Sequence, residues 1–364
     1  MSRERVLVAM SGGVDSSTAA ALLVAQGHEV AGATLRLWCT GGAQASTRSC
    51  CSLSDIEDAR AAAATLGIRH YLLDEMAEFE REVVVPFVDA YLAGETPNPC
   101  VRCNTHLKFG SLFARAARMG FDMLATGHYA RIERTPEGPV LRRAVDAAKD
   151  QSYVLWGLRR EDLARIRLPL GSLTKAETRE VARRAGLGLA EKTESQDICF
   201  VQGGRYAEFV AARAEGAAVT GPGELVDATG RVLGTHRGAI HYTVGQRRGL
   251  GAAAGEPLYV LRVDAARNRV VVGPASELVA PGMQVRELNW VSCGAPGGAI
   301  EVQVQVRYRT RPVAARVLPL EGARARVEFA EPQRGVAPGQ SAVFYRGALV
   351  LGGGVIDAPG ALPG

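Results

Sequence analysis

The sequence predicts a doubly wound parallel α/β domain, then a small mixed central domain, and then a C-terminal β-barrel. The first observation is an alternation of short apolar runs and helical segments over the first 200 residues, which predicts a parallel sheet covered by helices. The second is a glycine-rich turn between the first apolar run and the first helical segment. The third is a change beyond Gly203, where short β-type runs alternate with Gly and Pro turns. We therefore expect domains over residues 1–205, 206–280 and 281–364.

The individual elements follow from local signals. Apolar runs predict the strands, and capping boxes at Ser54–Glu57 and Thr174–Glu177 predict two helix starts. The expected N-terminal strands are 5–9, 30–37, 69–74 and 122–126, with a hairpin over 131–145. The expected helices are 14–26, 54–66, 75–93 with an interruption at Pro86, 105–119, a short one after 149–153, 174–186 and 205–215. The expected barrel strands are 299–308, 314–320, 323–329 and 341–346.

The composition is that of an ordinary soluble protein. The chain has 364 residues, 47% of them hydrophobic and 22% charged, which is enough for two or three domains with a large core. We expect a cytoplasmic location and no membrane partner, because the sequence shows no signal peptide and no apolar run approaching the ~20 residues that span a bilayer. The formal net charge of +5 is compatible with an RNA partner but is too small to establish one.

The glycine-rich turn is the strongest functional signal. In Ala9-Met-Ser-Gly-Gly-Val-Asp-Ser-Ser17, a strand, a turn and a helix follow one another, so backbone N–H groups and the helix dipole point at a bound phosphate. Asp15 could hold a metal ion. A kinase-type phosphate loop has a Lys before its Ser or Thr, and this loop has none. It instead resembles the PP-loop of ATP pyrophosphatases, which form an adenylated intermediate and release pyrophosphate.

Three further segments belong at the same edge of the predicted sheet. The segment Leu35–Cys51, which includes a polar loop from Trp38 onward, the stretch Pro97–Asn104 and the turn Gly127–Tyr129 would all lie at carboxyl ends of strands. Open α/β sheets bind their ligands at this edge. We expect the whole stretch Gly94–Asn104 to be irregular, with the backbone before Cys100 held in a turn by Asn98 and Pro99.

Cys100-Val-Arg-Cys103 lies in this stretch, and three interpretations compete. A structural zinc site needs two more ligands, and no second Cys-x-x-Cys motif is present. An inert buried pair is at odds with a loop bounded by Pro, Asn and Arg. Thiol chemistry is the interpretation that we favour, because Arg102 and nearby helix N-termini favour the thiolate. Seven cysteines in a chain of this type indicate thiol chemistry or metal binding rather than a disulfide framework.

Cys199 is ambiguous by itself, because Ile-Cys-Phe-Val is typical of a core strand. Its polar approach, Glu194–Asp197, is typical of a site loop, and we expect a loop followed by a short strand. We interpret Cys39, Cys50, Cys51 and Cys293 as structural or incidental.

The motifs together resemble the family of bacterial tRNA-specific 2-thiouridylases. The resemblance extends from Val6 to about Ile356. It is carried by the PP-loop, Thr-Pro-Asn-Pro-x-x-x-Cys-Asn, Ala-Thr-Gly-His-Tyr, Lys-Asp-Gln-Ser-Tyr, Ile-Cys-Phe, Thr-Val-Gly-Gln-Arg-Arg-Gly-Leu and Pro-Gly-Gln-Ser-Ala-Val-Phe-Tyr. It implies ATP- and Mg²⁺-dependent transfer of sulfur to C2 of the wobble uridine in tRNAs for Lys, Glu and Gln. It also implies a cysteine desulfurase or a sulfur-relay protein as donor, and a C-terminal barrel that binds tRNA.

The resemblance also assigns residues. Cys199 would carry sulfur as a persulfide, with Cys103 as its catalytic partner. The implied ATP contacts are Ala9, Met10, Ser11, Gly12, Gly13, Val14, Asp15, Ser16, Leu35 and Gly127. The implied target-base and tRNA contacts are Asn98, Pro99, Cys100, His128, Lys149, Asp150, Gln151, Arg307, Tyr308 and Gln340.

Cys100 departs from part of the family, because members with a single cysteine in this motif have Asp here. With Cys100, Cys103 and Cys199, the chain offers the three thiolates that a [4Fe–4S] cluster with one open iron requires. We keep this cluster as an alternative hypothesis.

Two other functions are compatible with parts of the sequence. A PP-loop ligase of the synthetase or amidotransferase kind shares the loop but needs no paired thiols. A nucleotide-sensing RNA-binding protein needs no catalytic cysteine. The alternating Arg307-Tyr-Arg-Thr-Arg311, read as a strand, would place three guanidinium groups on one side, which suits phosphates.

Overall fold

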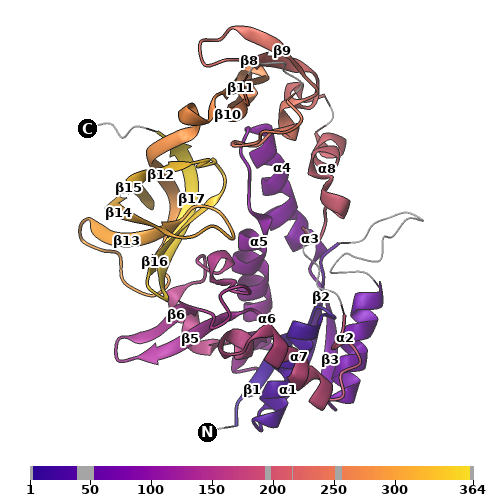
Figure 1. Cartoon of the computed structure of the whole chain (residues 1–364). Coiled ribbons are helices and arrows are strands. Elements are labelled where there is room, and N and C mark those ends of the chain that lie inside the picture. The colour runs from indigo at the N-terminus through magenta and orange to yellow at the C-terminus, as the bar shows by residue number, and fades with distance from the viewer. Residues whose placement is uncertain (1–2, 39–52, 193–197, 215, 251–255, 361–364) are drawn as a thin grey trace.

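The computed structural model describes residues 3–38, 53–192, 198–214, 216–250 and 256–360. The N-terminal part is built on a five-stranded, fully parallel sheet with the strand order β3-β2-β1-β4-β7 (Figure 1). Its strands are β1 (Arg5–Ala9), β2 (Glu29–Arg36), β3 (Arg69–Asp74), β4 (Met123–Thr126) and β7 (Ile166–Arg167).

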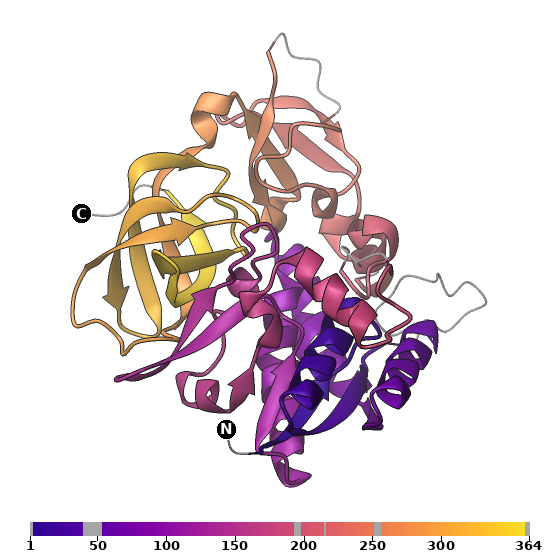
Figure 2. The ribbon, with the colours of Figure 1, turned by 60° about the horizontal axis from the view of Figure 1, so that its bottom comes forward.

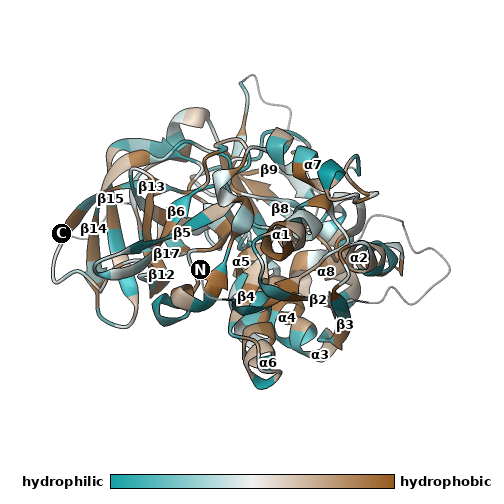
Figure 3. Cartoon of the chain, turned by 90° about the horizontal axis from the view of Figure 1, so that it is seen from below, coloured by the Kyte–Doolittle hydropathy of each residue, from teal (hydrophilic) through white to brown (hydrophobic). Residues whose placement is uncertain are grey.

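Helices cover both faces of this sheet, as the doubly wound prediction requires. Val6 and Val8 of β1 pack on one face with α1 (Val14–Ala25), α2 (Leu53–Thr65) and α7 (Lys175–Arg184). Leu7 points to the other face and joins the core beneath two long helical segments. The strands are largely apolar, whereas α7 presents a polar outer face (Figure 3). Alternate residues of one strand therefore anchor two separate cores.

The first long helical segment runs through Pro86 without a break, so the predicted interruption is wrong. It comprises α3 (Met76–Phe79), a π-helical segment (Glu80–Val84) and α4 (Val85–Leu92). Pro86 cannot donate to the carbonyl of Glu82 four residues earlier. Arg102 Nε donates to that carbonyl oxygen at 2.7 Å instead, which satisfies the acceptor that the proline leaves open.

The second segment begins earlier than predicted. It comprises α5 (Pro99–Arg102), a π-helical segment (Cys103–Ser111) and α6 (Leu112–Arg118). The expectation of an irregular turn up to Asn104 is therefore wrong. Asn98 caps the helix by accepting from the Cys100 N–H at 3.2 Å, and Pro99 occupies the first turn. Pro is well tolerated there, so the residues that indicated irregularity are a helix start signal.

Two β-rich units follow. The central unit contains α8 (Tyr206–Arg213) and a mixed sheet in the order β10-β11-β8-β9. Its strands are β8 (Gly223–Val226), β9 (Val232–His236), β10 (Tyr259–Asp264) and β11 (Arg269–Gly273). The C-terminal unit is a six-stranded antiparallel barrel, closed by the pairing of β12 with β17. Its strands are β12 (Val279–Asn289), β13 (Ile300–Gln305), β14 (Val313–Leu320), β15 (Arg324–Arg334), β16 (Ser341–Arg346) and β17 (Leu349–Pro359).

The predicted hairpin, β5 (Ala130–Thr135) and β6 (Gly138–Arg143), extends the barrel sheet rather than the sheet of its own unit (Figures 1 and 2). Buried hydrogen bonds reinforce this junction. Tyr153 donates to the Ser341 carbonyl at 2.8 Å, and Trp156 Nε1 donates to Ser341 Oγ at 3.0 Å. The barrel is therefore fixed to the N-terminal unit by main-chain pairing and by buried polar contacts.

Across the part of the chain that the structure describes, no helix combines the length and the apolar character that crossing a membrane requires.

Candidate active site

The phosphate loop adopts the predicted strand–turn–helix geometry. β1 ends at Ala9, and α1 begins at Val14 with Gly13 as its N-cap in an extended conformation. Ser16 Oγ accepts from the Ser11 N–H at 3.1 Å and donates to the Gly13 carbonyl at 3.2 Å. These bonds fold the loop over the start of the helix, where helical N–H groups and the helix dipole favour an anion.

Glycine is required at two positions around this loop. Gly12 has φ +72°, and a Cβ there would lie 2.1 Å from the Asp55 carbonyl oxygen of α2. Gly127, just after β4, packs so closely on α1 that a Cβ would lie 2.6 Å from the Ser16 nitrogen. The ends of β1 and β4 and the start of α2 thus meet at the loop, as the strand-end argument predicts for Gly127.

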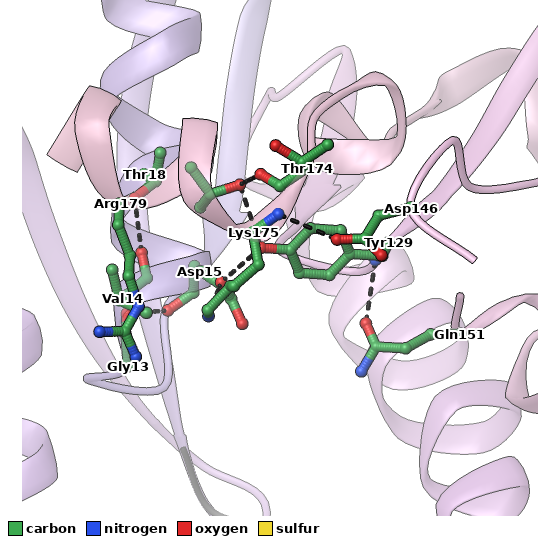
Figure 4. A network of polar contacts seen from close by, with 12 residues as sticks. Gly13, Val14, Asp15, Thr18, Tyr129, Asp146, Gln151, Thr174, Lys175 and Arg179 are labelled. Carbon is green, nitrogen blue, oxygen red and sulfur yellow. Dashed lines mark hydrogen bonds and ion pairs between the residues drawn. The ribbon is translucent and has the colours of Figure 1, made fainter. Parts of the chain in front are cut away.

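Two lysines from distant segments bind this loop, and the sequence analysis did not identify either. Lys175 Nζ lies 2.7 Å from Asp15 Oδ1, which also accepts from the Tyr129 hydroxyl at 2.9 Å (Figure 4). Lys192 Nζ donates to the Gly12 carbonyl at 3.0 Å and forms ion pairs with two carboxylates of α2. The capping box did place Lys175 at a helix start, but nothing in the sequence placed that helix beside the loop.

The predicted metal site can be checked by comparing the oxygen ligands that the loop offers with those that Mg²⁺ takes. Mg²⁺ in phosphate sites takes one or two protein carboxylates together with phosphate oxygens. Asp15 supplies one partly exposed carboxylate at the loop, and both of its described contacts are made through Oδ1. The donors present therefore fit a Mg²⁺ ion that arrives with a nucleotide.

The predicted thiols lie on one helix start and one turn. Cys100 is exposed, Cys103 is buried at 9% exposure, and Cys199 is half-buried. Cys103 belongs to the core beneath the sheet's second face, and Cys199 packs against that same core, as do Ala9 and Leu35. Cys199 and Phe200 form a turn, so the strand predicted there is wrong. Phe200 anchors this turn by packing edge-on against Phe87 at 5.1 Å between ring centroids.

The comparisons with known proteins cover nearly the whole chain. Residues 4–203 match the family model described as a tRNA methyl transferase HUP domain, 209–274 a tRNA methyl transferase PRC-barrel domain, and 281–356 an aminomethyltransferase beta-barrel domain. A protein of Geobacter metallireducens named tRNA-specific 2-thiouridylase MnmA is 51% identical over 362 residues, which is 98% of this chain and 97% of that protein. The proteins of that name from Moorella thermoacetica and Cereibacter sphaeroides are 48% and 50% identical over 97% of this chain and 99% and 94% of theirs.

The chain belongs to the tRNA-specific 2-thiouridylase family.

The residues for which the family resemblance implies tRNA contacts differ in what their side chains contact in the structure. Asp150, Gln151 and Gln340 use their side chains to hold the chain itself. Asp150 Oδ1 accepts from the Ala144 N–H at 3.0 Å, Gln151 Oε1 from the Tyr129 N–H at 2.9 Å, and Gln340 Nε2 donates to the Thr96 carbonyl at 2.7 Å. Asn98 caps the helical segment that begins at Pro99 and carries Cys100 and Cys103, which we call the thiol helix. Lys149 lies half-buried beside Asp150. A contact of these residues with tRNA stays a prediction.

Arg307 and Tyr308 lie just beyond the end of the barrel strand β13, and Arg307 contacts the central unit. The strand predicted through Arg311 is wrong: β13 ends at Gln305, and a turn follows with Arg309 at φ +68°. Three guanidinium groups therefore do not line up on one side. Arg307 Nη2 donates to the Val244 carbonyl at 2.8 Å, and burial lowers the pKa of its guanidinium. Burial raises the pKa of Tyr308; the charge of Arg309 lowers it, and Asp150 and Cys100 raise it.

His128 lies beneath the site rather than on its surface. The ring is buried, bonds Thr126 Oγ1 at 2.8 Å and lies 6.1 Å from the Phe109 ring. Burial lowers the pKa of His128 well below its usual value, and the charge of Lys108 lowers it further. The ring is therefore neutral at physiological pH.

Some residues for which the sequence makes predictions lie outside the described part of the chain: Cys39, Cys50, Cys51, most of the loop that ends at Cys51, and Glu194–Asp197.

Proposed function

We propose that this chain is an ATP-dependent tRNA 2-thiouridylase, which replaces the C2 oxygen of the wobble uridine in tRNAs for Lys, Glu and Gln with sulfur. The observation that carries this proposal is a PP-loop at the carboxyl end of β1, together with Cys103 inside, and Cys199 packed against, the core on the other face of the same parallel sheet. The relatives that bear this name, at 48–51% identity over nearly the full length, support it. We assign 1–205 to catalysis, 206–280 to a central domain and 281–364 to tRNA binding.

The first step is activation of the base. The uracil C2 oxygen is a poor leaving group, so it must first be activated by adenylation. It attacks the α-phosphorus of ATP, and the bond from that phosphorus to pyrophosphate breaks. The N–H groups at the start of α1 bind the phosphates, while Ser11 and Ser16 hold the loop in place. Mg²⁺ bound with the nucleotide would neutralise phosphate charge, with Asp15 as the protein carboxylate that holds it. Leu35 and Gly127 would border the adenosine.

The second step transfers sulfur. A desulfurase or relay protein loads Cys199 as a persulfide, whose terminal sulfur attacks C2, and the C2–O bond breaks with release of AMP. The Cys103 thiolate then attacks Cys199 Sγ and breaks the S–S bond, which leaves thiouridine and a Cys103–Cys199 disulfide. An external dithiol reduces that disulfide for the next cycle. The target base must leave its stack to reach the site, where Asn98, Pro99 and Cys100 would border it.

The cluster alternative finds no support in the side-chain arrangement. Within the described residues, no group of three or more His, Cys, Asp or Glu side chains is placed to hold a metal ion. Cys100 is exposed while Cys103 is buried. The thiols of this conformation therefore do not form a three-thiolate site, and we route no step through a cluster.

The test is sulfur incorporation into unmodified tRNA-Lys, read by mass spectrometry of the wobble nucleoside. ATP, Mg²⁺, a cysteine desulfurase and cysteine are supplied, and the reaction is repeated without ATP. Thiouridine that depends on ATP supports the proposal. Intact ATP binding without thiouridine, in protein prepared with and without oxygen, would instead point to a PP-loop ligase.

A further inference from the structure

The phosphate loop itself supplies no positive charge for the leaving group of adenylation. Adenylation expels pyrophosphate, whose negative charge grows as the bond to the α-phosphorus breaks. Phosphate loops of the kinase type place a lysine on the terminal phosphates, and the stretch Ala9–Ser17 contains no cation. A cation must therefore come from another segment if one acts on the leaving group.

Lys175 occupies the required place. It is the first residue of α7, and its Nζ lies 2.7 Å from the Asp15 carboxylate, at the second residue of α1. Its side chain is 14% exposed and that of Asp15 is 31% exposed, so the pair lies at the mouth of the loop in a partly desolvated position. Charge interactions there are stronger than in bulk water.

The backbone at Lys175 is held firmly. The capping box joins Thr174 and Glu177 through bonds of 2.7 and 3.3 Å, and the Lys175 N–H donates to Asp146 Oδ2 at 3.0 Å. The Tyr129 hydroxyl lies 3.0 Å from Thr178 on the next turn and bonds Asp15 at 2.9 Å. The helix start and the loop are thus tied together (Figure 4).

The neighbouring cation is less suited to this task. Lys192 lies against two carboxylates, Asp55 at 2.7 Å and Asp58 at 2.6 Å, and against the Gly12 carbonyl. These contacts neutralise its charge and tie the loop to α2.

We propose that Lys175 is a catalytic residue of adenylation: its ammonium exchanges the Asp15 carboxylate for the terminal phosphates of ATP and stabilises the departing pyrophosphate. The exchange leaves Asp15 available to Mg²⁺, so the ion pair of the nucleotide-free protein keeps both groups in position. This inference rests on the proposed function, because it assigns a role within the same adenylation.

The experiment compares Lys175→Met, Lys175→Gln and Lys175→Arg with wild type. Lys175→Gln keeps a hydrogen-bond donor toward Asp15 without the charge. Arg184→Met, on the exposed last turn of the same helix, is the matched control for loss of a positive charge. Calorimetry measures the dissociation constants of ATP, pyrophosphate and AMP with Mg²⁺, and single-turnover assays measure AMP release with tRNA.

We expect Lys175→Met and Lys175→Gln to bind ATP and pyrophosphate about tenfold more weakly, with AMP binding changed less than about twofold. AMP release should fall by about 10²-fold, the cost of removing one group that stabilises transition-state charge. Lys175→Arg should recover most of the ATP affinity, and Arg184→Met should match wild type.

Equal weakening of all three ligands would overturn the inference, because it would mean that Lys175 only supports the loop. Unchanged AMP release in Lys175→Gln would overturn it as well. A wild-type protein that binds ATP but forms no thiouridine would refute the proposed function instead, and that result is distinct from both.

Discussion

The candidate site has a phosphate-loop end, around Ala9–Ser17, and a thiol end, around Cys103 and Cys199. These two ends are built differently. At the phosphate-loop end, short bonds from Ser16, Lys175 and Lys192 fix a loop whose geometry is complete without a ligand. At the thiol end, Cys103 is 9% exposed at a helix start, and Cys199 lies half-buried in a turn that follows residues outside the described part of the chain. A tRNA base reaches Cys103 only if the surrounding side chains move.

This difference suits the two tasks. A phosphate site gains from donors that are in place before the ligand arrives, because reorganising them during the reaction would raise the barrier. In the proposed mechanism, one macromolecule loads the persulfide and another receives its sulfur, so the carrier has to be reached from outside and then brought to the base. The comparison therefore predicts that changes at one end leave the function of the other end intact.

The largest expected effect is at the thiol end. Cys199→Ser should reduce thiouridine formation by more than about 10³-fold, because a hydroxyl cannot carry the transferable sulfur. ATP affinity should stay within about twofold of wild type, as measured by calorimetry. Cys293→Ser, a half-buried cysteine of the barrel junction, is the control and should retain activity. A Cys199→Ser protein that still forms thiouridine would remove the persulfide step from the mechanism.

The next effect is at the phosphate loop. Gly12→Ala adds a Cβ at φ +72° that would lie 2.1 Å from the Asp55 carbonyl, so the loop must shift. We expect ATP binding to weaken by at least about tenfold and the free energy of unfolding to fall by about 2 kcal/mol. Gly27→Ala is a matched control, because Gly27 has φ +83° and open space around its Cβ position. It should cost about 1 kcal/mol through the backbone alone and leave ATP affinity unchanged. Equal ATP affinities in the two variants would show that the close contact with the Asp55 carbonyl does not disturb the ATP site.

The phosphate-loop end was predictable from sequence because its geometry is local. A strand, two glycines and a helix within residues 5–25 determine where the N–H groups point. Tertiary contacts could not be predicted: Lys175 and Lys192 lie 160 and 180 positions from their partners on the loop, Asp15 and Gly12. No periodicity in the chain indicates which loop a given helix start faces.

The thiol end was predicted less well for the same reason. The signals at Asn98 and Pro99 fit both a turn and a helix cap, and the choice depended on the Arg102 contact with the Glu82 carbonyl, which holds the helix against its neighbour. At Arg307–Arg311, an alternating pattern indicated a strand, but Arg307 turns back to bond Val244 of the central unit. Charge alternation alone does not distinguish a strand from a turn at a domain junction.

A smaller effect concerns His128, whose ring is buried against Thr126 and Phe109. Its folded pKa is lowered well below the ordinary value, so the folded protein holds a neutral ring while the unfolded chain binds a proton below about pH 6.5. This contribution to stability is present above pH 6.5 and is lost as the pH falls toward the folded pKa. Between pH 7.5 and 5.5 we expect wild type to lose about 1 kcal/mol more than His128→Gln, measured by urea unfolding. Equal losses of stability in wild type and His128→Gln would mean that a group other than His128 takes up the proton.

The smallest expected effect distinguishes the two chemistries of the thiol end. Cys100 is exposed at the start of α5, where it would border the base without reacting. Cys100→Ser should therefore raise the KM for tRNA by about threefold and leave kcat close to wild type, since serine is nearly isosteric and only a contact is altered. A cluster ligand would behave differently: its loss would abolish turnover as completely as Cys199→Ser does. Steady-state kinetics of the two variants, prepared side by side without oxygen, separates a thiol that contacts the base from one that holds iron.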